Sequence, residues 1–262
     1  MPPIRCASNV AESAHAADGL TDRMFRPTVV RFASPLVIVA AVFGVHAAIR
    51  FGGLWNFQLI ALSMVVVWPL PWLLCAREGR ADIGLRAPVS RWWMLSAPAA
   101  SLAVLSIGAA TAWALFGSGP DNWFTHHAAE LGRIAGGVPP GLSAPALFWT
   151  LTVPPMIFSP LGEEFLYRGF LLRVGSARWG DRAGNLVQAA AFAIVHLAHY
   201  GLLPVQPALI VLYLPTNFVV ALALAWMVRR SGSLWVAVVA HSAYNLGLNA
   251  LVFGLLPELV GL

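Results

Sequence analysis

Residues 206–228 read QPALIVLYLPTNFVVALALAWMV and contain no acidic or basic side chain. A helix needs about 20 consecutive, mostly apolar residues to cross the hydrocarbon core of a bilayer, so this run predicts a membrane-spanning helix. The whole chain has the same character, because 59% of its 262 residues are hydrophobic and only 10% are charged. A soluble domain carries about 25% charged residues, and a disordered chain has few apolar ones. The composition therefore argues against both of these classes.

Six further apolar runs have a similar length, which gives seven predicted spans. We therefore expect an all-α fold, a polytopic transmembrane helical bundle of about 7–8 spans. The longest predicted loop, residues 117–144, is expected to carry a short interfacial helix. The predicted spans cover residues 32–50, 54–76, 92–116, 145–172, 185–203, 206–228 and 233–256.

The arginines predict the orientation of the spans. All 16 basic residues are Arg, and thirteen fall in the N-terminal segment and in the loops after the second, fourth and sixth spans. Arg50 and Arg133 fall on the opposite side, and Arg168 lies inside a span. Because cytoplasmic loops carry the excess of Lys and Arg, we expect a cytoplasmic N-terminus.

The same distribution explains the net charge of +5, so no nucleic-acid partner is predicted. A basic complement made of Arg alone is typical of a GC-rich bacterial genome. We therefore expect an integral membrane protein of a bacterial cell membrane.

The fourth predicted span contains three ionisable residues, Glu163, Glu164 and Arg168. A charged group at the centre of a bilayer costs at least ~2.5–3.5 kcal/mol, so ionisable residues in spans are candidates for function. Glu164 and Arg168 are four residues apart on one helical face, which predicts an ion pair that braces the site. Glu163 points ~100° away from Glu164 and is expected to stay outside that pair.

Two later spans carry further polar clusters at a similar depth. Phe192 and His196 lie in the fifth predicted span, and His241 and Asn245 lie about one helical turn apart in the seventh. At 1.5 Å per residue, Glu163, His196 and His241 lie roughly 13–16 Å from the cytoplasmic ends of their spans. We therefore expect three helices to bring these side chains into one buried site.

These residue types meet the chemical requirements for hydrolysing a peptide bond. A carboxylate beside a neutral imidazole can deprotonate a water molecule. A second imidazole and a carboxamide can donate hydrogen bonds to a developing oxyanion. Competing motifs are missing from the sequence, because Ser159 and Ser242 lack a G-x-S-x-G context and no H-E-x-x-H occurs.

The order and spacing of these residues resemble the CPBP family of intramembrane proteases, the CAAX protease and bacteriocin-processing (Abi) group. Its Glu-Glu-x-x-x-Arg motif matches residues 163–168, Phe-x-x-x-His matches 192–196, and His-x-x-x-Asn matches 241–245. The resemblance covers roughly residues 145–255. We expect three parts: a cytoplasmic tail (1–31), N-terminal transmembrane helices and loops (32–144) and a CPBP-type catalytic membrane core (145–256).

The resemblance implies an intramembrane endopeptidase that acts on a protein or peptide substrate within a lipid bilayer. The first glutamate and the histidine of the second motif would activate water. The histidine and asparagine of the third motif would stabilise the oxyanion, and the remaining motif residues would support the site. The implied catalytic residues are Glu163, His196, His241 and Asn245, and the implied supporting residues are Glu164, Arg168 and Phe192.

Three alternatives stay open at this point. Glu163, His196 and His241 could form a two-histidine, one-carboxylate zinc site, so zinc is a candidate cofactor although no metal is firmly predicted. Buried ionisable residues also line ion pathways, which leaves a transporter as an alternative. A fold can be kept without its activity, which leaves a non-catalytic scaffold. The sequence does not set the oligomeric state.

Overall fold

The computed structural model describes residues 23–56, 58–135, 141–199, 202–203 and 205–260, and these residues form helices without strands. The expected all-α fold is confirmed for this part of the chain. Most of the expected N-terminal tail lies outside the described residues. The elements are α2 (Pro27–Val30), α3 (Pro35–Gly52), α4 (Gln58–Val66), α5 (Leu70–Leu74), α6 (Arg77–Asp82), α7 (Trp93–Phe116), α8 (Trp123–Ala135), α9 (Ala144–Val153), η1 (Pro154–Phe158), α10 (Ser159–Glu163), η2 (Glu164–Leu171), α11 (Leu172–His196), α12 (Pro207–Ser231) and α13 (Leu234–Val260).

Five helical stretches among the described residues are long and apolar enough to cross a membrane. Together with the low charge content, they make the chain an integral membrane protein. The expected count of about 7–8 spans is not confirmed, because two predicted spans form one stretch with a reversal inside it and the predicted span over residues 54–76 is broken. The five stretches are Pro35–Gly52, Trp93–Phe116, Ala144–His196, Pro207–Ser231 and Leu234–Leu255.

The predicted span over residues 54–76 is not one helix. It consists of α4 and α5, which are separated by a turn that ends at Pro69. Proline has no backbone N–H to donate and its ring clashes with the preceding turn, so two prolines within three residues interrupt the helix. The nine residues of α4 extend only about 14 Å, which is too short to cross a bilayer core.

The fourth and fifth predicted spans form one helical stretch that reverses at Gly180. This residue has φ +82° and ψ 162°, a conformation that glycine adopts without steric cost. A Cβ atom on Gly184 would lie 2.3 Å from the backbone nitrogen of Ser176. A straight helix would separate these two residues by about 12 Å, so the chain turns back on itself here. The two arms correspond to the two spans that the sequence predicts.

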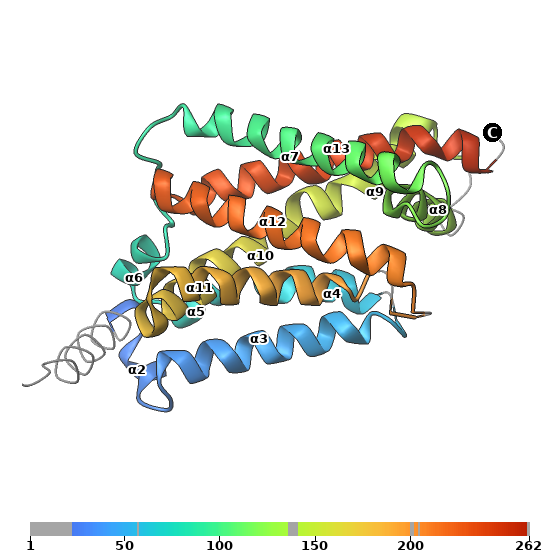
Figure 1. Ribbon diagram of the computed structural model, residues 1–262. Coiled ribbons are helices and arrows are strands. Elements are labelled where there is room, and N and C mark those ends of the chain that lie inside the picture. The colour runs from blue at the N-terminus through green and yellow to red at the C-terminus, as the bar shows by residue number, and fades with distance from the viewer. Residues whose placement is uncertain (1–22, 57, 136–140, 200–201, 204, 261–262) are drawn as a thin grey trace, which may run out of the picture.

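The long helices lie side by side in Figure 1. Helix α13 packs against α7 and α12, α12 packs against α11, and α11 packs against α3. Helix α8 lies at one end of the bundle, where it contacts α13, and it confirms the helix expected within residues 117–144. The segment from η1 to η2 contacts α13, α4 and α3, so the two glutamates lie between helices that are distant in sequence.

The arginine-bearing loops meet at one end of the bundle, on the left in Figure 1. Arg86 Nε donates to the carbonyl of Gly232 at 2.9 Å, which joins the loop before α7 to the turn before α13. Arg229 pairs with Asp181 at 3.1 Å, which joins the end of α12 to the turn in α11. The loops that the sequence assigns to one side of the membrane are therefore neighbours in space.

Candidate active site

The first motif lies in a helix with irregular winding. The π-helical turns η1 and η2 flank the short helix α10, and Glu163 and Glu164 stand at the junction of α10 and η2. Pro154, Pro155 and Pro160 each lack the N–H that a regular helix would use. Wide turns of this kind are frequent at functional sites. Both glutamates are fully buried, at 1% and 0% exposure.

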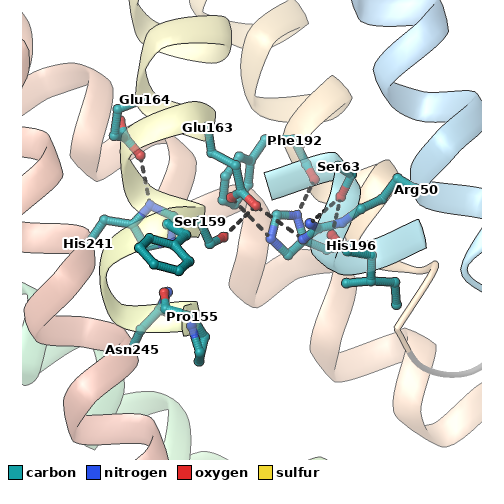
Figure 2. A network of polar contacts seen from close by, with 12 residues as sticks. Arg50, Ser63, Pro155, Ser159, Glu163, Glu164, Phe192, His196, His241 and Asn245 are labelled. Carbon is teal, nitrogen blue, oxygen red and sulfur yellow. Dashed lines mark hydrogen bonds and ion pairs between the residues drawn. The ribbon is translucent and has the colours of Figure 1, made fainter. Parts of the chain in front are cut away.

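Glu163 contacts three side chains from three helices (Figure 2). Its Oε1 accepts a hydrogen bond from the Ser159 hydroxyl at 2.7 Å and lies 3.1 Å from Arg50 Nη2. Its Oε2 lies 3.6 Å from His196 Nε2 and has no hydrogen-bond partner among the described residues. One carboxylate oxygen is thus held in place, and the other faces an imidazole nitrogen.

The tautomer of His196 follows from its backbone contact. Its Nδ1 lies 2.7 Å from the carbonyl of Phe192, which can only accept, so Nδ1 carries the hydrogen. In the neutral ring Nε2 is then an acceptor, and it points toward Glu163 Oε2. Two acceptors at 3.6 Å cannot bond to each other, but one water molecule can donate to both.

Arg50 is the main residue of this cluster that the sequence reasoning missed. The sequence placed it at the end of the first predicted span, on the side opposite most other arginines, and gave it no role. In the structure Arg50 is 1% exposed in the last turn of α3. Its Nη1 donates to the Ser63 hydroxyl of α4 at 3.1 Å, while Nη2 contacts Glu163. A signal was present: a buried glutamate outside the Arg168 pair needs another cation.

Glu164 forms the second half of the site. Its Oε1 accepts from Arg168 Nη1 at 3.1 Å, which confirms the predicted ion pair, and from His241 Nδ1 at 2.8 Å. The sequence predicted the first contact from the spacing of four residues, and the second comes from the packing of α13 against η2. Glu164 therefore fixes the orientation of the His241 ring.

Phe192 separates the two histidines. Its ring centroid lies 4.1 Å from that of His196 and 6.0 Å from that of His241. The Arg168 guanidinium lies 4.4 Å from the same ring centroid, at a distance typical of a cation–π contact. The ring therefore restricts the movement of both imidazoles and of the bracing arginine.

Asn245 is held by the irregular helix. Its Nδ2 donates to the carbonyl of Pro155 at 2.8 Å, and the side chain is partly buried (Figure 2). A carboxamide nitrogen carries two hydrogens, so one donor remains after this bond. Asn245 and His241 lie about one helical turn apart on α13, as the sequence predicts.

A cavity of about 680 Å³ borders this cluster. His196, His241 and Asn245 line it, together with Arg50 and Ser159. Among the described residues, the lining does not include Glu163, whose three contacts all do line the cavity. The Glu163 carboxylate therefore lies behind side chains that line the cavity.

The three candidate zinc donors do not form a recognisable metal site among the described residues. Within the described part of the chain, no group of three His, Cys, Asp or Glu side chains is placed to hold a metal ion. As arranged among the described residues, Glu163, His196 and His241 do not form such a group.

Residues 145–247 match the family model described as Type II CAAX prenyl endopeptidase Rce1-like. This segment is Rce1-like. The Rce1-like segment contains all three motifs, and the match confirms the resemblance to CPBP proteases that the motifs predicted. The family is one of proteases. No curated protein and no solved structure matches the chain. The matched segment excludes α3, so Arg50 joins the site from outside it.

Proposed function

We propose that the chain is an intramembrane endopeptidase that hydrolyses peptide bonds in a protein or peptide substrate. The observation that carries the proposal is the approach of Glu163 Oε2 to His196 Nε2 at 3.6 Å, beside a cavity. The Rce1-like segment supports the reaction class, since its family is one of proteases.

Glu163 and His196 activate the water molecule in this proposal. With an ionised carboxylate and a neutral imidazole, both atoms accept hydrogen bonds. A water molecule that donates one hydrogen to each turns a lone pair toward the substrate carbonyl. The attack forms the C–O bond, moves the carbonyl electron pair onto oxygen and transfers the water proton to Glu163 or His196.

The second half of the cycle returns that proton. The tetrahedral intermediate collapses, the C–N bond breaks, and the protonated Glu163 or His196 donates its proton to the leaving nitrogen. This residue acts first as a base and then as an acid, so no proton is gained or lost by the protein over a full turnover.

His241 and Asn245 stabilise the oxyanion in this proposal. Glu164 holds the His241 ring through Nδ1, which leaves Nε2 to donate to the substrate oxygen whenever it carries a hydrogen. Asn245 keeps one amide hydrogen after its bond to Pro155. Donors that are oriented before the reaction contribute strongly, because they do not reorganise in the transition state.

Arg50 and Arg168 balance the two buried carboxylates. Each glutamate has one guanidinium at 3.1 Å, so two negative carboxylates face two positive guanidinium groups. A buried charge without a partner is costly, and each pair lowers that cost. We assign Arg50 and Arg168 positioning roles, since both act through the glutamates.

The site lies among membrane-spanning segments, so we propose a substrate that is itself apolar near its cleavage site. We also retain a cytoplasmic N-terminus, because the arginine-bearing loops gather at one end of the bundle. A bacterial cell membrane is the proposed location.

The test compares the peptide termini generated in membranes of cells that produce wild type, Glu163→Gln or Glu78→Gln. Glu78 is exposed in α6, so its replacement controls for the loss of a carboxylate. We expect new termini with wild type and Glu78→Gln, and none with Glu163→Gln. Equal cleavage by Glu163→Gln, at equal protein levels, would overturn the proposal.

A further inference from the structure

A second cavity, of about 320 Å³, lies at the arginine-bearing end of the bundle. Its lining comes from the loop before α7, the first turns of α11 and the end of α12. Arg86, Arg173 and Arg229 all line it. Among the described residues, none of the proposed catalytic side chains borders this cavity, so it is separate from the active site.

The charge of this cavity is unbalanced. Three guanidinium groups line it, Asp181 is the acid among its described lining residues, and Asp82 outside the lining also acts electrostatically on Arg173, which leaves more positive than negative groups. The Asp181 side chain is 77% exposed and pairs with Arg229, so solvent screens its effect on the other two arginines. Holding like charges together around a partly buried space is unfavourable unless an anion joins them.

Two of the three arginines are held by the fold. Arg86 Nε donates to the carbonyl of Gly232 at 2.9 Å. Arg229 Nη2 donates to the Ser176 hydroxyl and to the Asp181 carbonyl, both at 2.9 Å. These bonds orient the groups before any ligand arrives, which lowers the entropy cost of binding.

Two guanidinium nitrogens at this cavity lack a hydrogen-bond partner. Arg173 Nε and Arg229 Nε are both buried, and neither has a partner among the described residues. Buried guanidinium nitrogens without partners are rare, because each lost bond costs free energy. Donors are therefore available from two of the arginines that line this cavity.

We propose that this cavity binds a phosphate group. The planar guanidinium fork matches phosphate oxygens, which accept several charge-assisted bonds at once. Two sources share this chemistry: the headgroup of an anionic phospholipid and a soluble phosphorylated molecule. Basic pockets between transmembrane helices favour lipid headgroups, and this cavity lies among the helix ends.

The test measures lipid and anion binding to delipidated protein in detergent. The probes are phosphatidylglycerol, zwitterionic phosphatidylcholine and inorganic phosphate, with sodium chloride at matched ionic strength as the salt control. We expect wild type to bind one phosphatidylglycerol at least about tenfold more tightly than phosphatidylcholine, as measured by native mass spectrometry. If inorganic phosphate raises the thermal unfolding temperature as much as phosphatidylglycerol does, the ligand is instead a soluble phosphate compound of the same chemistry.

The matched variants are Arg173→Gln and Arg230→Gln, since Arg230 is exposed next to Arg229 on the same helix. We expect Arg173→Gln to lose the preference for phosphatidylglycerol over phosphatidylcholine, and Arg230→Gln to keep it. Equal losses in both variants, or a wild type that prefers neither phosphatidylglycerol nor phosphate over its control, would overturn the proposal. If Arg173→Gln does not fold, Arg173→Lys keeps the charge without the fork and should show an intermediate preference.

Discussion

Arg50 Nη2 lies 3.1 Å from Glu163 Oε1, and this buried ion pair joins helix α3 to the Rce1-like segment. The pair makes the proposed base depend on a helix that the family match does not include. Ser63 of α4 holds the other guanidinium nitrogen, so two N-terminal helices position one carboxylate. This dependence can be measured.

We predict that Arg50→Met lowers both activity and stability. Removal of one partner of a buried pair leaves an uncompensated charge, which costs about 3–5 kcal/mol. The double variant Arg50→Met with Glu163→Gln should regain thermal stability but stay inactive. Thermal unfolding in detergent and a peptide-cleavage assay measure the two effects. Arg77→Met, at an exposed position in α6, is the control, and equal behaviour of Arg50→Met and Arg77→Met would contradict the proposed role.

Glu164 should affect the chemical step through His241. We predict that Glu164→Gln lowers kcat more than it changes KM, because the ring loses its anionic partner while an acceptor remains near Nδ1. Glu164→Gln combined with Arg168→Met should restore stability without restoring kcat, since it removes the unpaired guanidinium. Recovery of full kcat in that double variant would show that Glu164 serves only as the counter-ion of Arg168.

Asn245→Ala should slow cleavage strongly. Removal of one oxyanion donor costs about 10²–10³ in kcat, with little change in KM. Asn217→Ala is the comparison, because Asn217 lines the same cavity and its Nδ2 donates to a backbone carbonyl, that of Tyr213 in its own helix. We expect it to lower stability with less than about a tenfold loss of kcat. Steady-state kinetics on both variants would refute the oxyanion role if their losses in kcat were alike.

The arrangement of donors predicts a reaction that does not need a metal. Among the described residues, no group of three His, Cys, Asp or Glu side chains, the three candidate ligands included, is placed to hold a metal ion. We expect purified protein to keep its activity during titration with EDTA and 1,10-phenanthroline. Loss of activity that added Zn²⁺ restores would contradict this expectation and would require a rearranged site.

Local regularities account for what sequence reasoning predicted correctly. Apolar runs of sufficient length indicate membrane helices, because unsatisfied backbone groups are too costly in lipid for other structures. The Glu164–Arg168 pair followed from helical spacing alone. The break in the second predicted span has a local reason as well, because Pro69 and Pro71 both fall within it.

Amino-acid order alone determined the membrane class, the three motifs and their positions on helices, because each depends on composition or on spacing within a single element. Only the tertiary structure decided that Arg50 neutralises Glu163, that His241 contacts Glu164, and that His196 presents Nε2 to the free carboxylate oxygen. These contacts join helices that are far apart in the chain. Their partners are selected by packing and by the cost of burying a lone charge, and neither leaves a periodic pattern in the sequence.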